Sequence, residues 1–141
     1  MISIEWLAGF FDGEGCIGIY GAPSLSLHMT LVQTNFGVMS EIQKEFGGRL
    51  YEVKRYSSKH NRIWKLSWNA KTTFNLLQKI FPYLKVKQEQ AQLVLEEWIP
   101  LLYSKGCAKG IPRGAKIVSF ENKAKRLEIK KRLSDLKHRL K

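Results

Sequence analysis

Apolar and polar residues alternate with unusual regularity over residues 24–33 of this 141-residue chain. The apolar side chains at the odd positions of 25–31 point one way, and the Ser, His and Thr side chains between them point the other. A period of two predicts a strand with one packed face and one solvated face. Residues 16–20 alternate in the same way, and the Gly-Ala-Pro sequence at 21–23 predicts a turn that joins the two strands in a hairpin.

A second hairpin is expected over residues 51–68, around a polar loop at 57–61. Its strands again alternate, so we expect one packed face and one solvated face. The side chains expected to point inward are Tyr51, Val53, Trp64, Leu66 and Trp68. The side chains expected to point outward are Glu52, Lys54, Ile63, Lys65 and Ser67.

Helical spacing of apolar residues predicts the remaining elements. The first helix begins after Ser3, a suitable N-cap, and runs to about Asp12, where two glycines stop it. A glycine-rich loop is expected at 104–118. Further helices are expected over residues 38–46, 69–84 and 88–103 and, rich in Lys and Arg, over 120–140.

This order of elements, αββαββα with an extra C-terminal helix, predicts an α+β fold. We expect a four-stranded antiparallel sheet with helices on one face and a polar, basic face left open. The length suits one domain over residues 1–141. Its core is expected at about 3–103, followed by a basic loop and helix over 104–141.

The charge of the chain narrows the class of partner. Lys and Arg number 24 against 12 Asp and Glu, a net charge of +12, which favours a polyanion such as DNA or RNA. Cys16 and Cys107 suggest neither a disulfide framework nor a cysteine zinc site, and the spacing of His28, His60 and His138 fits no zinc motif. Neither a membrane-spanning run nor a signal peptide is recognised, so an intracellular protein is expected.

The most informative local sequence is LAGFFDGEG at residues 7–15. A short helix of small and apolar residues runs directly into two carboxylates, Asp12 and Glu14. Carboxylates at a helix C-terminus face the negative end of the helix dipole, and a divalent cation would relieve that conflict. Oxygen ligands favour Mg²⁺ or Ca²⁺. Gly9 and Gly13, four residues apart, would let a second helix approach closely.

This nonapeptide resembles the signature of the LAGLIDADG homing endonucleases, with Glu14 where many members have Asp. The resemblance extends over about 6–102 and implies a saddle-shaped sheet whose open face lies along the major groove of DNA. In that family two such helices pack side by side, each bringing one acid to a shared active site. Because this chain has one copy of the motif, the resemblance implies a homodimer. The implied interface residues are Trp6, Gly9, Phe10 and Gly13.

The resemblance also implies the catalytic residues. Glu14, with the backbone carbonyl of Gly13, would bind the metal ions. Asp12 would either touch the metal or cap backbone N–H groups of the turn that follows, and we favour the structural role. Gln33, at the end of a strand, would help to position the attacking water. Lys87, in a segment that resembles the family's loop after the second long helix, would stabilise the charged transition state.

Outward-pointing residues of the strands are the expected DNA contacts, because Ser, Thr, Lys and Glu side chains can all bind base edges. The expected base contacts are Tyr20, Ser24, Ser26, His28, Thr30, Glu52, Lys54 and Lys65. The expected phosphate contacts are Arg49, Arg55, Lys59 and Arg62.

The resulting hypothesis is a homodimeric endonuclease that cuts both strands of double-stranded DNA at a long, pseudo-palindromic site. Mg²⁺ would be the cofactor, Mn²⁺ would substitute, and Ca²⁺ would support binding without cleavage. One alternative is a maturase that binds intron RNA, and another is a non-catalytic DNA-binding regulator. The basic C-terminal helix would contact phosphates or would simply be solvated. The expected location is a prokaryotic cytoplasm or an organelle, with no membrane involved.

Overall fold

The computed structural model describes residues 1–21, 25–54, 59, 61–102 and 120–139. Its central feature is a four-stranded antiparallel sheet of spatial order β1-β2-β4-β3. The strands are β1 (Gly15–Tyr20), β2 (Ser26–Gln33), β3 (Arg49–Val53) and β4 (Ile63–Trp68). The predicted α+β class and the antiparallel four-stranded sheet are therefore confirmed.

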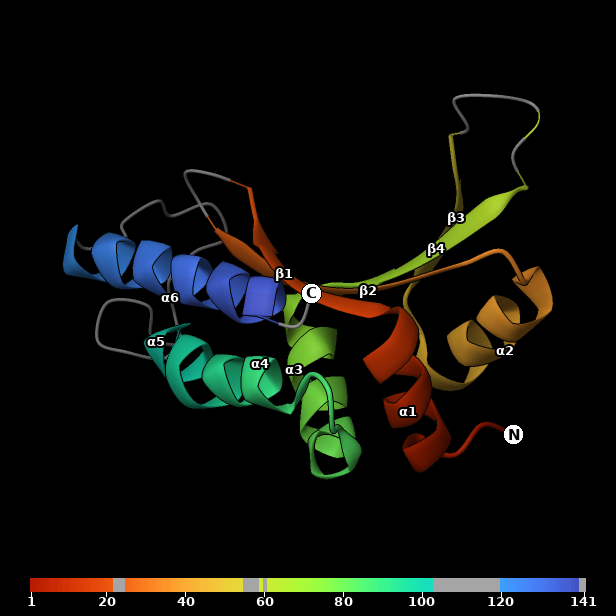
Figure 1. Cartoon of the computed structure of the whole chain (residues 1–141), viewed down its shortest axis with the longest axis horizontal. Helices are drawn as coiled ribbons and strands as arrows, with labels where there is room; N and C mark the ends of the chain where they lie inside the picture. Colours follow the sequence, from red (N-terminus) through yellow and green to blue (C-terminus); the bar gives the residue numbers. More distant parts are fainter. Residues whose placement is uncertain (22–24, 55–58, 60, 103–119, 140–141) are drawn as a thin grey trace.

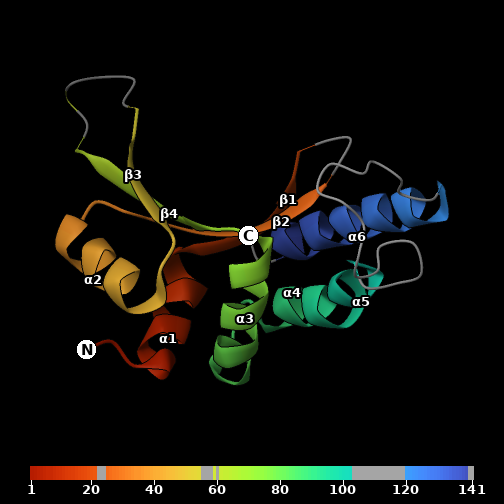
Figure 2. The same cartoon turned by 180° about the vertical axis from the view of Figure 1, so that it is seen from behind.

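The helices are α1 (Ile4–Glu14), α2 (Phe36–Phe46), α3 (Ala70–Ile80), η1 (Phe81–Tyr83), α4 (Gln88–Leu93), η2 (Val94–Trp98), α5 (Ile99–Leu102) and α6 (Phe120–Arg139). Figure 1 shows a sheet that curves upward at both ends, with α1, α2 and α3 below it. The view from behind in Figure 2 shows the same layers. None of the described helices lies over the concave upper side of β2 and β4, and we call that side the open face.

Helix α1 has two local features that favour a helix, an N-cap at Ser3 and a stripe of apolar residues at helical spacing. The Ser3 side chain accepts the backbone N–H of Trp6 at 3.1 Å, which satisfies one of the free N–H groups of the first turn. Leu7, Ala8 and Phe11 are buried against the sheet. The helix continues to Glu14, past the end predicted from its glycines, so the second acid of the motif is its last residue.

The core lies between the sheet and the helices beneath it. Buried residues alternate along β2 as predicted, and the strands β1, β2 and β4 pack against α1, α2 and α3. The segment α4–α5 adds to the core through its contact with α3. Trp68 and Trp98 are its largest fully buried side chains, and the Trp68 indole N–H donates to the carbonyl of Phe46 at 3.1 Å. Within the described part of the chain, no helix has the length and apolar character needed to cross a bilayer.

Strand β3 faces the opposite way from its prediction. In its register with β4, Leu50 pairs with Leu66, which is buried in the core, whereas Tyr51 pairs with Lys65. Cross-strand partners share a face of the sheet. Tyr51 and Val53 therefore belong to the open face, and Glu52 belongs to the helix-covered side. Leu50 takes the core-facing position beside Leu66, and Tyr51 is left 37% exposed on the open face.

The helix predicted over 88–103 is present but irregular. It runs as α4, the π-helical turn η2 and α5 without a loop between them. Pro100 is the second residue after η2 and has no N–H to donate, and its ring crowds the carbonyl one turn earlier, so a widened turn is expected there. The loop predicted at 104–118 lies outside the described residues.

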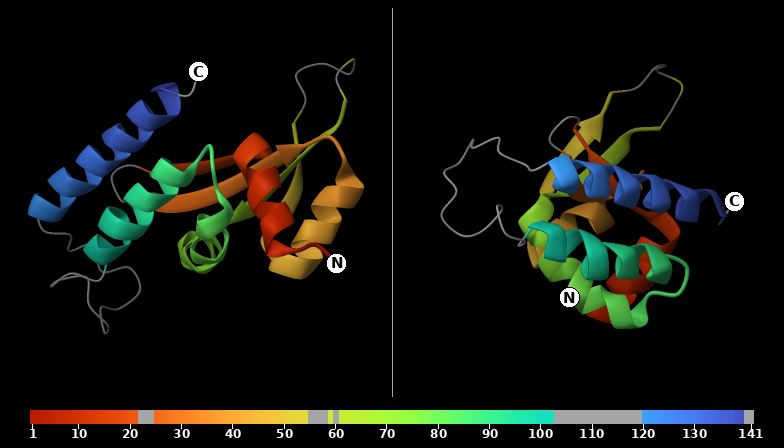
Figure 3. Two further views of the ribbon diagram at one scale, coloured as in Figure 1. Left: turned by 60° about the horizontal axis from the view of Figure 1, so that its bottom comes forward. Right: turned by 90° about the vertical axis from the view of Figure 1, so that its left-hand side faces the viewer.

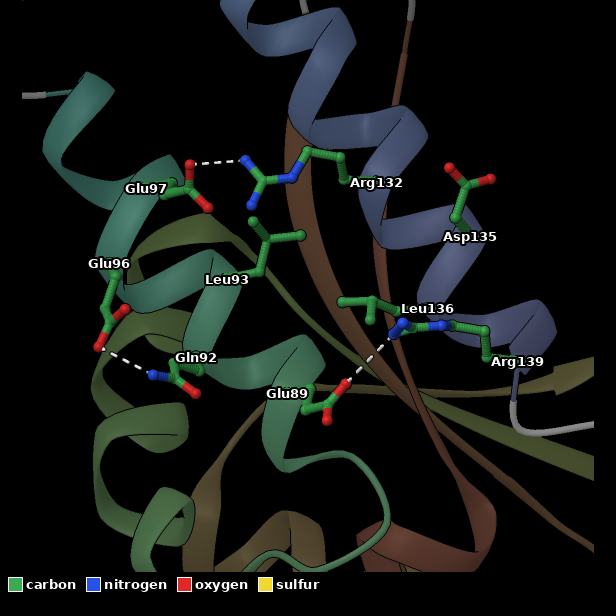
Figure 4. Close-up of a pocket in the computed structure, with 9 residues that line it drawn as sticks. All are labelled: Glu89, Gln92, Leu93, Glu96, Glu97, Arg132, Asp135, Leu136 and Arg139. Carbon is green, nitrogen blue, oxygen red and sulfur yellow. Dashed lines mark hydrogen bonds and ion pairs between the residues drawn. The ribbon is translucent and has the colours of Figure 1, made fainter.

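The predicted C-terminal helix is confirmed as α6, which runs alongside α4 in both views of Figure 3. Ile129 and Leu133 are its buried residues. A groove of about 530 Å³ lies between the segment α4–η2 and α6. Figure 4 shows the two ion pairs that bridge it. They are Arg132 to Glu97 at 2.6 Å and Arg139 to Glu89 at 3.9 Å. A small apolar contact and exposed ion pairs therefore attach α6 to the domain.

Candidate active site

Glu14 is the exposed last residue of α1, at the point where the chain enters β1. Among the described residues, its carboxylate has neither a hydrogen bond nor an ion pair. The ring of Phe11 is buried and lies against the backbone of Gly15, where any side chain would collide with it. This contact fixes the junction between α1 and β1. It therefore also fixes the backbone position of Glu14, the residue at that junction.

Asp12 has quite different surroundings from Glu14. Its two carboxylate oxygens accept the backbone N–H groups of Lys85 at 2.6 Å and of Lys87 at 2.9 Å. The ammonium group of Lys87 in turn donates to the backbone carbonyl of Asp12 at 2.5 Å. Three hydrogen bonds thus join the end of α1 to the segment that precedes α4.

This arrangement explains why an acid is tolerated at the end of α1. Asp12 contacts Lys87, the N-cap residue of α4, so its charge lies near the positive end of a second helix dipole. Helix α1 has no basic residue in its own last turn, and Lys87 supplies a cation there from a distant part of the sequence. The predicted structural role agrees with these bonds, but the amides belong to residues 85 and 87 and not to the turn after α1.

Gln33 lies near the same end of the sheet. Gly15 pairs with Leu31, so Gln33 is the next residue on that face of β2, beyond the start of β1. Its side-chain oxygen accepts the backbone N–H of Thr34 at 2.7 Å and the Thr34 hydroxyl at 3.2 Å. In this arrangement the side chain is folded onto its own neighbour, and its role in positioning water stays a prediction.

The register of the sheet assigns the residues of the open face. One row across the four strands is Cys16, Thr30, Ser67 and Arg49. The next row across β2, β4 and β3 is Val32, Lys65 and Tyr51. Towards the other end of the β1–β2 hairpin, the partners are Gly18 with His28 and Tyr20 with Ser26. Six of the predicted DNA contacts are thus on the open face, namely Tyr20, Ser26, His28, Thr30, Arg49 and Lys65.

Other predicted DNA contacts lie elsewhere. Glu52 was expected on the open face, but it pairs with Trp64 on the helix-covered side and forms an exposed ion pair with Arg62 at 3.8 Å. Lys54 and Lys59 are exposed, just beyond β3 and between β3 and β4. Ser24 and Arg55 lie outside the described residues.

Sequence reasoning missed several residues of the open face, because strands with apolar residues on both faces give no clear alternation. Val32 and Tyr51 are 39% and 37% exposed, although Tyr51 was expected to point inward and Val32 was assigned to neither face. The register with β4 is the signal that identifies the face of Tyr51. The open-face residues that were missed are Val32, Tyr51 and Val53, whereas Ile63 and Ser67 lie on the outward side that was expected for them.

Tyr20 lies flat across β1. Its ring covers Gly18, where a side chain would collide with it, and its hydroxyl lies 3.9 Å from the Cys16 thiol. Partial burial, and then the neighbouring thiol, raise the pKa of Tyr20 above its ordinary value, so the hydroxyl stays protonated at neutral pH. The ammonium of Lys137, from the last turn of α6, donates to the same thiol at 3.5 Å. The end of α6 therefore reaches the edge of the open face.

One side of α1 is left without a partner among the described residues. Trp6 is 45% exposed and stacks on Phe10, with 4.9 Å between the ring centroids. Gly9 and Gly13 are exposed on the same side, and a side chain built at either would meet no atom within 4 Å. The four residues predicted as an interface thus form one strip along α1, in which Trp6, Gly9 and Gly13 are exposed and Phe10 is half-buried. Their role as an interface stays a prediction.

The metal-binding capacity of one chain is limited. The described residues contain no group of three or more His, Cys, Asp or Glu side chains able to hold a metal ion together. The carboxylate of Glu14 is free, whereas both carboxylate oxygens of Asp12 accept hydrogen bonds from backbone N–H groups. The described residues of one chain therefore offer one free carboxylate at the end of α1.

Residues 7–92, more than half of the chain, match the family model of the LAGLIDADG endonucleases. The chain belongs to that family. The match begins at Leu7, the first residue of the motif, and extends to Gln92 on α4, so it includes Asp12, Glu14, Gln33 and Lys87. The family-model match therefore confirms the family that the motif at residues 7–15 indicated.

Solved LAGLIDADG structures share this fold. The homing endonuclease I-CvuI, crystallised with its target in the presence of 2 mM Ca, is 24% identical, with a TM-score of 0.70 over 94% of this chain and 80% of that chain. The homing endonuclease I-TnaI is 18% identical, with a TM-score of 0.57 over 99% of both chains. I-SmaMI, bound to an uncleaved DNA target with calcium ions, is 12% identical, with a TM-score of 0.66 over 96% of this chain and 46% of that chain.

Proposed function

We propose that this chain is a homodimeric, divalent-metal-dependent endonuclease that cuts both strands of DNA at a defined site. The observation that carries the proposal is the environment of Glu14, a free and exposed carboxylate beside an unpartnered helix face. A carboxylate with no partner at the negative end of a helix dipole is unfavourable unless a cation joins it. The LAGLIDADG family, to which the chain belongs, is a family of endonucleases.

The dimer is supported by the exposed strip on α1. An exposed Trp6 stacked on Phe10 would be costly in a monomer, and the open space at Gly9 and Gly13 would allow the backbone of a second α1 to approach. Because the contact would be isologous, it would bring the two copies of Glu14 together near the dimer axis. The match to I-SmaMI is in keeping with a dimer: nearly all of this chain matches 46% of that longer chain, so two copies of this chain would have about the size of one I-SmaMI chain.

Two copies of Glu14, with the carbonyl oxygen of Gly13 in each chain, would hold the metal ions. Hard oxygen donors of this kind suit Mg²⁺ and, in its place, Mn²⁺, whereas Ca²⁺ would allow binding without cleavage. When bound, such ions lower the pKa of water and stabilise charge on the leaving oxygen of a phosphodiester. Solved relatives include I-CvuI complexes prepared with Ca and with Mg, the latter with DNA not cleaved.

Lys87 would supply positive charge beside the reacting phosphate. Asp12 accepts its backbone N–H and holds its ammonium against the end of α1, so Asp12 acts as a positioning residue and not as a metal ligand. A cation held in place before the reaction can stabilise developing charge without reorganisation. Gln33 would have to leave Thr34 in order to orient a water molecule.

Double-stranded DNA is the proposed partner of the open face. The chain carries a net charge of +12, and the predicted base-contacting residues Ser26, His28, Thr30 and Lys65 lie side by side in the register of the sheet. A two-fold dimer would read a long, pseudo-palindromic target, one half-site for each chain. A prokaryotic cytoplasm or an organelle is the proposed setting for that contact.

The exposed basic residues of α6 favour a second candidate, a maturase that binds the intron RNA. Lys123, Lys125, Lys130 and Lys131 are all exposed and line a helix that contributes little to the core. Such a helix suits an RNA backbone as well as it suits a DNA backbone.

Selection from a pool of duplexes with a long randomised segment tests the proposal. Incubation with Mg²⁺ should yield double-strand breaks within one sequence family, and EDTA should abolish them. If the pool shows no sequence-dependent cutting while intron RNA is bound tightly, the maturase replaces the nuclease.

A further inference from the structure

The second row of the open face combines groups of unlike chemistry. Lys65 on β4 has Val32 of β2 on one side and Tyr51 of β3 on the other. Cross-strand neighbours have Cβ atoms about 5 Å apart, so the aliphatic stem of Lys65 is close to both side chains. Packing along the stem leaves the ammonium group directed away from the sheet.

Lys65 is also set apart by its place in the sheet. Strands β2 and β4 are the two central strands, and Lys65 is the one Lys or Arg that they present on the open face within the described residues. The other open-face residues of these strands are Ser26, His28, Thr30, Val32, Ile63 and Ser67.

Central and edge positions meet different parts of a duplex. A curved sheet that follows a groove brings its central strands to the floor of the groove, where base edges lie, and its edges to the phosphates. Arg49, on the edge strand β3, has its guanidinium 5.5 Å from the centroid of the Tyr51 ring, so it lies along the sheet edge. Lys65 is therefore placed for a base and Arg49 for the backbone.

The bases follow from the chemistry of the row. Lysine favours the O6 and N7 acceptors of guanine in the major groove, and the 5-methyl group of thymine is the apolar feature there. Val32 is 39% exposed and follows the polar residues Ser26, His28 and Thr30 on the open face of β2, so it is the apolar group of that strand that matches such a methyl group. Neighbouring strands are about 4.8 Å apart and base pairs about 3.4 Å, so Val32 and Lys65 reach the same or adjacent base pairs.

We propose that Lys65, between Val32 and Tyr51, specifies a guanine next to a thymine in each half-site of the target. The inference rests on the proposed function and assigns a sequence preference to it. By two-fold symmetry, the preference occurs twice in the full site, at equal distances from its centre.

The test compares the sites that wild type and variants select from one pool of randomised duplexes, bound in Ca²⁺ and then sequenced. Lys65→Met removes the charge and keeps the stem, and Val32→Ala removes the apolar contact. Lys79→Met is the matched control, because Lys79 is exposed on α3 beneath the sheet. Melting curves of all variants show that each is folded.

In the expected result, wild type selects a guanine beside a thymine in each half-site. Lys65→Met loses about tenfold or more of the preference for that guanine and keeps the other positions. Val32→Ala loses the preference for thymine, and Lys79→Met selects the wild-type sequence. An unchanged consensus for Lys65→Met with uniformly weaker binding would make Lys65 a phosphate contact and overturn the inference alone. If wild type selects no consensus at all, the proposed function fails as well.

Discussion

Lys87 and Asp12 are joined by two hydrogen bonds that run in opposite directions. The backbone N–H of Lys87 donates to the carboxylate of Asp12 at 2.9 Å, and the ammonium of Lys87 donates to the backbone carbonyl of Asp12 at 2.5 Å. The pair connects the last turn of α1 to the first turn of α4, two elements distant in the sequence. Through this pair, the ammonium group of Lys87 is held at the backbone of Asp12, two residues before Glu14 in α1.

Asp12→Asn should lower the free energy of unfolding by about 1–3 kcal/mol, because the amide would turn a donor towards a backbone N–H group that the carboxylate now satisfies. Urea denaturation at neutral pH measures this change. Asp135→Asn, an exposed acid on α6, is the control and should change stability by less than about 0.5 kcal/mol. Equal stability of Asp12→Asn and wild type would show that the carboxylate does not hold the two segments together.

Lys87→Met should slow cleavage by about 10²–10³-fold in kcat while leaving DNA binding in Ca²⁺ nearly unchanged, because a cation held beside the reaction acts on the transition state. Single-turnover cleavage of the selected duplex measures it. Lys85→Met is a close control, since Lys85 contributes its backbone N–H to Asp12 and its side chain is exposed. Equal rates for the two variants would exclude Lys87 from the chemistry.

The sequence predicted those parts of the fold that depend on local periodicity. The regular alternation before Gln33 and the cap at Ser3 predicted the presence of β2 and the start of α1, because one face of each element is clearly apolar. Strand β3 was assigned to the wrong face because Leu50 and Tyr51, adjacent in sequence, are both suited to the core. Local patterns cannot choose between them, and pairing with β4 does.

The candidate site was predicted in part, for a related reason. The rule that acids are disfavoured at a helix C-terminus indicated residues 12 and 14 as candidates for a site. It did not distinguish them, since the separate role of Asp12 depends on amides that the fold brings from residues 85 and 87. Contacts over such a sequence distance leave no periodic signal.

Gly9→Leu should convert the proposed dimer to a folded monomer without double-strand cleavage. The monomer has open space around Gly9, and replacing a helical glycine by leucine favours α1 itself by roughly 0.5–1 kcal/mol. The loss would therefore arise from the interface and not from misfolding. Sedimentation equilibrium gives the mass, and circular dichroism melting gives the stability. A wild-type protein that is monomeric at micromolar concentration, or a variant that still dimerises, would contradict the proposed interface.

Metal exchange should separate binding from cleavage. Mg²⁺ and Mn²⁺ should support cutting, Ca²⁺ should support binding alone, and EDTA should abolish cutting, because the proposed ligands are carboxylate and carbonyl oxygens. Gel shift and cleavage of the same selected duplex, run side by side in each metal, measure both steps. Cutting at an undiminished rate in EDTA would remove the metal from the proposal.

The most direct test of the central claim is cleavage by Glu14→Gln, with Glu5→Gln as the control at the opposite, N-terminal end of α1. Both changes replace an exposed acid by its amide, so they match in size and in charge. The proposal predicts that Glu14→Gln binds the selected duplex like wild type in Ca²⁺ and cuts neither strand in Mg²⁺, whereas Glu5→Gln cuts normally. Cleavage by Glu14→Gln at the wild-type rate would contradict the assignment of the active site.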